Sequence, residues 1–257
     1  MNSSSNHQVI SLAYTGVLLA SFIFGACTRD KAKPPPTTAV KQTVQKTLKS
    51  NRPMPMEACA DCHPEQFEAF KKSGMGRSLY TPESQPAIED FDPIKATVQH
   101  PAMPARYRAY IDKQGVWWQE ELIGADYRRR VRVRYIIGSG NHSRSYLGME
   151  NGELIQLPLT WYSQAKRWDM SPGYEGKGQM RFMRTIMPEC LFCHNGLTPH
   201  VTQTASTYEW PLQEGIDCSR CHGPGKAHVQ NRLKGLSSTN GAALSDIINP
   251  AKLSPEK

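Results

Sequence analysis

Three short cysteine motifs constrain this chain more than any other feature of its 257 residues. Each motif has two cysteines separated by two residues, and a histidine follows the second cysteine directly. The motifs are CADCH at 59–63 (motif 1), CLFCH at 190–194 (motif 2) and CSRCH at 218–222 (motif 3). Two cysteines at this spacing lie on one tight turn and can hold a single group, which is zinc, a redox disulfide or haem c.

The histidine after each cysteine pair favours haem c. In haem c the two cysteines form thioethers with the vinyl groups, and the next histidine is the proximal iron ligand. Histidine makes up 8 of 257 residues, so a chance histidine after all three pairs has a probability of roughly 3 in 100,000. We therefore predict three haem c groups. Their attachment residues are Cys59, Cys62, Cys190, Cys193, Cys218 and Cys221, and their proximal ligands are His63, His194 and His222.

Two alternatives use the same cysteines. Motifs 2 and 3 have the C-x₂-C…C-x₂-C spacing of a four-cysteine zinc ribbon, and a secreted domain could use the cysteines as disulfide staples. The zinc ribbon leaves motif 1 without a partner. Neither alternative explains the three histidines.

The start of the chain predicts export. Residues 9–26 are apolar and carry no charge, as in a secretory signal. Gly25 and Ala26 precede Cys27 as in a bacterial lipobox, so we predict a signal peptide at 1–26 and lipidation of Cys27. An uncleaved anchor or plain cleavage remain alternatives, because eighteen apolar residues could just span a bilayer. All three place the domain on the periplasmic or cell-surface side, and the first two tether it to the membrane.

Residues 27–57 are rich in lysine, proline, threonine and glutamine and predict an unfolded tether. Residues 58–257 have the length of one domain. The formal net charge is +8, and the six propionates of three haems would lower it to about +2. The basic excess therefore does not predict a nucleic-acid partner.

The pattern of residues 58–257 predicts an α+β fold. Residues 64–73 read as a short helix with a first-turn proline. From about 105 to 162 the pattern is that of antiparallel strands, with hairpin turns at DKQG (112–115) and ENGE (150–153). We expect a haem-cored domain with short helices and loops around this inserted β subdomain.

Two rows of side chains leave more than one interpretation. Arg130, Arg132 and Arg134 alternate with valines, and they form either a solvated sheet face or partners for haem propionates. Met180, Met183 and Met187 fall at helical spacing. For the methionines we expect core packing, because methionine usually fills gaps in a core.

The motifs, with CHGPGKAH at 221–228 as the most specific segment, resemble the multihaem c-type cytochromes related to the tetrahaem cytochrome of ammonia oxidisers. The segments GSGNHSRSYL, QLPLTWY and DMSPGY resemble those of exported multihaem cytochromes, and the similarity covers about 59–254. The resemblance implies closely packed haems that pass electrons, and other cytochromes as redox partners. Such relatives continue into further CxxCH sites, so this chain is short by comparison.

The resemblance also implies distal iron ligands. His228 is the first candidate, and Gly223-Pro224-Gly225 favours a turn that would direct it to a neighbouring haem rather than its own. His142, in a loop after a strand, is the second. Met75 stands where relatives often place a distal histidine, with glycines on both sides. His100 and His200 are weaker candidates.

The sequence thus predicts an exported electron-transfer protein with three covalently bound haems. The alternative is a multihaem oxidoreductase that acts on a small nitrogen or oxygen compound at a five-coordinate haem. The two differ in whether one iron position is open. Because the candidate distal ligands are at least as numerous as the haems, we favour electron transfer.

Overall fold

The structure is a computed structural model that describes residues 48, 54–196, 206–235 and 246–254. The signal segment, Cys27, most of the tether and His200 lie outside these residues. Across the part of the chain that is described, no helix has the length and apolar character needed to cross a membrane.

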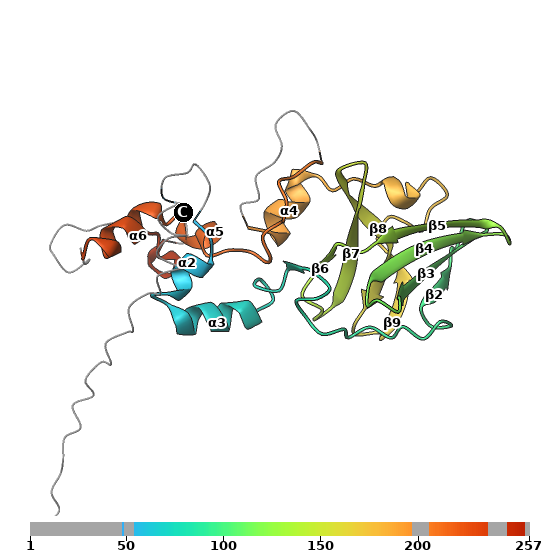
Figure 1. Cartoon of the computed structure of the whole chain (residues 1–257), viewed down its shortest axis with the longest axis horizontal. Coiled ribbons are helices and arrows are strands. Elements are labelled where there is room, and N and C mark those ends of the chain that lie inside the picture. The colour runs from blue at the N-terminus through green and yellow to red at the C-terminus, as the bar shows by residue number, and fades with distance from the viewer. Residues whose placement is uncertain (1–47, 49–53, 197–205, 236–245, 255–257) are drawn as a thin grey trace, which may run out of the picture. The chain divides into compact units, whose positions relative to one another are not determined.

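The strands form two antiparallel sheets (Figure 1). The five-stranded sheet has the order β1-β6-β7-β8-β9 and the four-stranded sheet the order β2-β3-β4-β5. The strands are β1 (Leu79–Tyr80), β2 (Thr97–Gln99), β3 (Ala105–Ile111), β4 (Trp117–Ile123), β5 (Tyr127–Arg132), β6 (Tyr135–Ile137), β7 (Ser143–Glu150), β8 (Glu153–Tyr162) and β9 (Arg167–Met170).

The two sheets pack on one shared core, because each turns an apolar face inward. Tyr107 of β3, Trp117 of β4 and Leu157 of β8 belong to the same buried cluster. The side-chain amide of Gln119 joins the sheets: it donates to the carbonyl of Leu159 at 3.0 Å and accepts from the Leu159 amide at 2.8 Å. Both polar atoms of this buried side chain thereby have a hydrogen-bond partner, as is usual for buried polar groups.

Both predicted hairpins are confirmed. β3 pairs with β4 across residues 112–115, and β7 pairs with β8 across Asn151 and Gly152. Asn151 and Gly152 both have positive φ, at 50° and 82°. Positive φ at both turn positions is the type I′ geometry that an Asn-Gly pair favours in a two-residue hairpin.

The β region is larger than predicted. It runs from β1 to β9 rather than over about 105–162, because short strands at both ends add to the sheets. The segment in which arginines and valines alternate is divided between the sheets: β5 belongs to the four-stranded sheet and β6 to the five-stranded sheet. The chain passes between the sheets at Val133 and Arg134.

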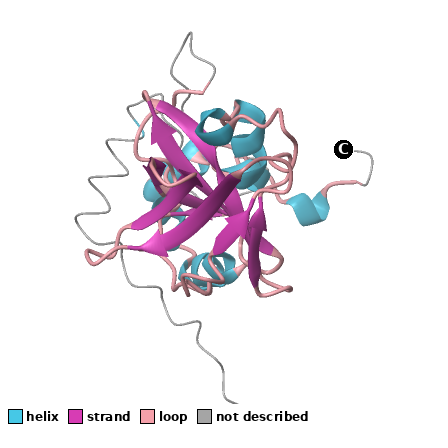
Figure 2. Cartoon of the chain, turned by 90° about the vertical axis from the view of Figure 1, so that its right-hand side faces the viewer, coloured by secondary structure: helices cyan, strands magenta, loops and turns pink. Residues whose placement is uncertain are grey.

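The helices are short (Figure 2). They are α2 (Glu57–Ala60), α3 (Pro64–Lys72), α4 (Pro188–His194), α5 (Ser219–His222) and α6 (Lys226–Leu233), with 3-10 turns η1 (Arg181–Met183) and η2 (Pro250–Lys252). The predicted helix after motif 1 is confirmed as α3, which has a proline in its first turn and no buried residue. Mixed helices and antiparallel sheets confirm the α+β class.

Two glycines allow the turn after α3 to approach the segment before motif 3. A Cβ on Gly215, which has φ of +66°, would lie 2.4 Å from the carbonyl oxygen of Gly76. The Gly215 amide donates to Leu79 at 2.6 Å, and the Ile216 amide donates to Met75 at 3.1 Å. The backbone contacts therefore hold motif 3 next to the chain that follows motif 1.

The predicted methionine core is wrong. Met180, Met183 and Met187 are 52%, 56% and 41% exposed. Only the three residues of η1 are helical there, so the helical spacing does not place the side chains on one buried face.

Candidate haem sites

Each cysteine motif lies on a helical turn. In motif 1, Cys59 is in α2 and Cys62 in the turn that leads to α3. Motif 2 forms the last five residues of α4, and Cys218 is the N-cap of α5, which contains the rest of motif 3. Residues three apart on a helix are neighbours on one face. The spacing therefore presents both thiols of each motif to one group.

Motifs 1 and 3 touch through their first cysteines. Cys59 and Cys218 share a side-chain hydrogen bond, which raises the pKa of Cys59 and lowers that of Cys218 to about 7. Burial also raises the pKa of Cys59. Two attachment sites that are 159 residues apart in the sequence are thus adjacent.

Two histidines of this region lie close together. The rings of His63 and His228 are nearly parallel, at 22°, with their centroids 6.4 Å apart. A metal–imidazole bond is about 2.0 Å and a ring centroid lies about 1.1 Å from its nitrogens, so imidazoles on opposite sides of one metal have centroids roughly 6.3 Å apart. The observed separation fits one metal ion between the two rings.

The Nδ1 atom of His228 contacts a carboxylate. Its Nδ1 lies 3.2 Å from Oδ1 of Asp246, and hydrogen bonds from Asn231 and His228 lower the pKa of Asp246. A hydrogen bond from Nδ1 fixes the tautomer and leaves Nε2 as the metal-binding nitrogen. Asp246 therefore fixes the orientation of the His228 ring.

Local structure places His228 beside motif 1. Gly223 and Gly225 have positive φ, at 80° and 65°, and form the predicted turn between α5 and α6. Val229 of α6 packs on the cluster that contains Met54 and Ala58 of the α2 region. The turn thus directs α6 back to the helix that carries Cys59.

His222 shows the same pattern as His228. Its Nδ1 lies 2.8 Å from the carbonyl oxygen of Ile248, and the Ile248 amide donates to the carbonyl of His222 at 3.0 Å. The ring is exposed on its other side. A carbonyl at Nδ1 makes that nitrogen the donor, so Nε2 is the nitrogen that can bind metal.

Motif 2 contacts motif 3 through the residues between the cysteines. The Arg220 guanidinium lies 4.3 Å over the Phe192 ring and donates to the carbonyl of Asn195 at 3.3 Å. The hydroxyl of Ser78 donates to the carbonyl of His194 at 2.6 Å, and burial lowers the pKa of His194. A lowered pKa keeps the imidazole neutral, which is the metal-binding form.

The surface around motif 2 suits a large apolar group. Cys190 and Cys193 are exposed, and so are the large apolar side chains of Phe192 (63%) and Met187 (41%). A porphyrin attached to the two thiols would cover them, so the residues fit haem c.

The zinc and disulfide alternatives lack support. All six motif cysteines are free thiols. Within the described ranges, which include these six, no three or more side chains of histidine, cysteine, aspartate or glutamate gather as a metal-binding group. Cys218 contacts Cys59 rather than the cysteines of motif 2, which a zinc ribbon requires.

The other predicted ligands differ in their surroundings. Met75 is 51% exposed in the turn after α3. His142 is exposed and its Nδ1 accepts from Gln164 at 2.8 Å, which gives no support to a ligand role. The loops of the two candidates are neighbours, since a Cβ on Gly74 would lie 3.7 Å from Nδ2 of Asn141.

His100 is a structural residue rather than a ligand. It is buried, at 2% exposure, and both ring nitrogens have partners. Nε2 lies 2.7 Å from the carbonyl oxygen of Tyr174, and Nδ1 accepts from the Ala102 amide at 3.0 Å.

Sequence reasoning missed the partners of the ligands. Asp246 lies 18 residues after His228 and Ile248 lies 26 residues after His222, each in a segment without a motif. Only the fold brings these oxygens to the imidazoles, so no local pattern could identify them.

Comparison with known proteins supports the haem assignment. Residues 160–223, which include motifs 2 and 3, match the family described as cytochrome c554 and c-prime. The match supports a c-type cytochrome family, and with it an electron-transfer protein with covalently bound haem c. No curated protein matches the chain.

One solved structure is similar. The outer cell wall cytochrome OcwA matches with a TM-score of 0.42 and 17% sequence identity over 70% of this chain and 33% of that chain. This chain therefore spans about a third of the length of that cytochrome.

Proposed function

We propose that this chain is an exported electron-transfer protein with three haem c groups, one on each CxxCH motif. The observation that carries the proposal is the separation of 6.4 Å between the ring centroids of His63 and His228. The first is the predicted proximal histidine of motif 1 and the second follows motif 3. Such a pair would hold a haem iron through two imidazoles, which would suit electron transfer rather than substrate binding.

Haem c, when bound, supplies an iron that takes up and releases one electron. The chain would hold the three groups through its cysteine pairs and His63, His194 and His222. His228 would be the distal ligand at motif 1, with Asp246 as its hydrogen-bond acceptor. A carboxylate at Nδ1 increases the electron donation of an imidazole and fixes its orientation.

The contacts between motifs support a cluster rather than separate sites. Motif 3 touches motif 1 through Cys218 and Cys59, and motif 2 through Arg220 and Phe192. The attachment sites therefore follow the spatial order 1–3–2, which differs from their order in the sequence. Motif 3 is the central site of the proposed cluster.

Export and tethering are part of the proposal. The apolar segment 9–26 and Cys27 support a lipoprotein on the periplasmic or cell-surface side. The partners would be other redox proteins, and the resemblance of the motifs implies that these are cytochromes. His142 and Met75 remain proposed ligands of the other irons.

The haem count is tested on mature protein from a host that attaches haem c. We expect an intact mass that exceeds the processed chain by three haems, with a matching pyridine haemochrome spectrum. Replacing both cysteines of one motif by serine should remove one haem and leave two. Zinc in place of haem, or fewer than three haems in the parent, would contradict the proposal.

A further inference from the structure

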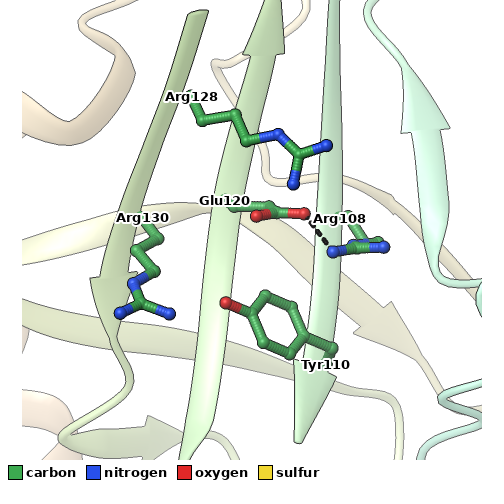
Figure 3. Close-up of a pocket in the computed structure, with 5 residues that line it drawn as sticks. All are labelled: Arg108, Tyr110, Glu120, Arg128 and Arg130. Atoms are coloured by element: carbon green, nitrogen blue, oxygen red, sulfur yellow. Dashed lines mark ion pairs between the residues drawn. The ribbon is translucent and has the colours of Figure 1, made fainter. Parts of the chain in front are cut away.

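The outward side of the four-stranded sheet is rich in arginine. Because opposite residues of paired strands share a face, the register of β3, β4 and β5 gathers one set of side chains there. Figure 3 shows five of them, which line one pocket. The pocket has a volume of about 320 Å³. The arginine face consists of Arg106, Arg108, Tyr110, Trp118, Glu120, Leu122, Arg128, Arg130 and Arg132.

Two arginines of this face stack on aromatic rings. The guanidinium of Arg130 lies 4.5 Å over the ring of Trp118, and that of Arg108 lies 5.0 Å over the ring of Tyr110. Stacking of this kind orders an arginine side chain before a ligand arrives. Less conformational entropy is then lost on binding, which favours affinity.

The charge of the face is largely uncompensated. Glu120 is its one carboxylate, and it pairs with Arg108 at 2.5 Å. Arg132 reaches Glu83 only at 3.9 Å, and both side chains are largely exposed. Within the described residues, Arg106 and Arg128 have no carboxylate partner at all. Asp112 at the edge of the face accepts from Trp118 at 2.8 Å and also interacts with Arg130. Five arginines thus face two carboxylates, and the face keeps an excess of positive charge.

We propose that the arginine face docks an acidic protein partner. Arginine, tyrosine and tryptophan are the residues that dominate binding energy in protein interfaces, and lysine, which is depleted there, is absent from the set that forms this face. The planar guanidinium binds carboxylates in a bidentate way. A second copy of this chain is disfavoured, because two such faces would bring like charges together.

The spacing of the face defines a probe. Alternate residues of a strand are about 6.7 Å apart, so Arg128, Arg130 and Arg132 form a row that an extended acidic segment can match. The probe is a labelled peptide with glutamate at every second position. Its control has glutamine at the same positions. A labelled single-stranded oligonucleotide of equal length tests the alternative that the face binds nucleic acid through stacking and phosphates.

The experiment measures binding of each probe to the mature, haem-loaded protein by fluorescence anisotropy. We expect the glutamate peptide to bind, and Arg128→Glu/Arg130→Glu to weaken it at least about tenfold. Added salt should weaken it too, because exposed charges are screened. The matched control is Arg167→Glu, which changes an exposed arginine of β9 outside the face. It should leave binding within about twofold.

Arg128→Gln/Arg130→Gln, with an intermediate expected loss, guards against misfolding of the doubly reversed variant. All variants should keep the visible and far-UV spectra of the parent. Equal affinity of the parent and Arg128→Glu/Arg130→Glu would overturn the proposal, and so would equal affinity for the glutamine peptide. Tighter, arginine-dependent binding of the oligonucleotide would overturn the acidic protein as the occupant.

Discussion

His228→Ala tests the proposed ligand pair most directly. The centroid separation of 6.4 Å between His63 and His228 is close to the value expected for two imidazoles that bind one iron ion. Alanine removes the imidazole but none of the six attachment cysteines. We therefore expect all three haems to remain attached, while one iron loses its distal ligand and becomes high-spin. About one third of the low-spin ferric signal should disappear from the EPR spectrum.

The same substitution in a variant that lacks the haem of motif 1 shows which iron His228 binds. Cys59→Ser/Cys62→Ser should lack the haem of motif 1. If His228 binds that iron, adding His228→Ala to this background should create no further high-spin signal. If His228 binds the iron of its own motif or of motif 2, the high-spin signal should appear in both backgrounds.

The matched control is Gln230→Ala, which changes an exposed residue of the same helix α6. It should leave the visible and EPR spectra unchanged. The proposed role of His228 is refuted if His228→Ala keeps the full low-spin signal of the parent. If His228→Ala instead loses covalent haem, His228 is needed for the attachment site to fold.

Three further substitutions test other regions. Cys27→Ser should release the domain from membranes or leave an unprocessed precursor, and a variant processed and membrane-bound like the parent would exclude lipidation. Arg144→Ala should lower the free energy of unfolding, measured by urea titration, by about 3–5 kcal/mol. The reason is that the buried Glu89 carboxylate loses the guanidinium that lies 3.1 Å away. A loss below about 1 kcal/mol would contradict this. Met75→His should lower the highest potential in a redox titration, since Met/His ligation raises the potential, whereas an unaltered titration would leave Met75 as a packing residue.

The parts of the fold that could be predicted from the sequence are those that depend on residues close together in the chain. The hairpin at Asn151 and Gly152 follows from two positive φ angles in adjacent positions, and α3 follows from a proline in the first turn. The cysteine motifs are equally local, because thioether attachment and proximal ligation need residues within one turn. Each of these patterns has its physical cause within a few residues.

The parts that sequence missed depend on distant contacts. Alternation predicts strand character for 127–137, but it does not tell which sheet a strand joins. The chain leaves one sheet and enters the other at Val133 and Arg134. The prediction of a methionine core was wrong for a related reason. Helical spacing places side chains on one face only where a helix forms, and η1 has only three residues.

The surroundings of His228 depend both on a local sequence pattern and on contacts between distant residues. The turn of Gly223-Pro224-Gly225 is a local pattern, and it correctly predicts that the chain reverses after motif 3. The partner across the ring, His63, is 165 residues away in the sequence and comes close only because α6 packs on the α2 region. The carboxylate of Asp246 comes from a third segment. The proposed distal ligand site thus depends on packing between distant segments. The sequence identifies the candidate histidine, whereas the fold is needed to propose which iron it binds.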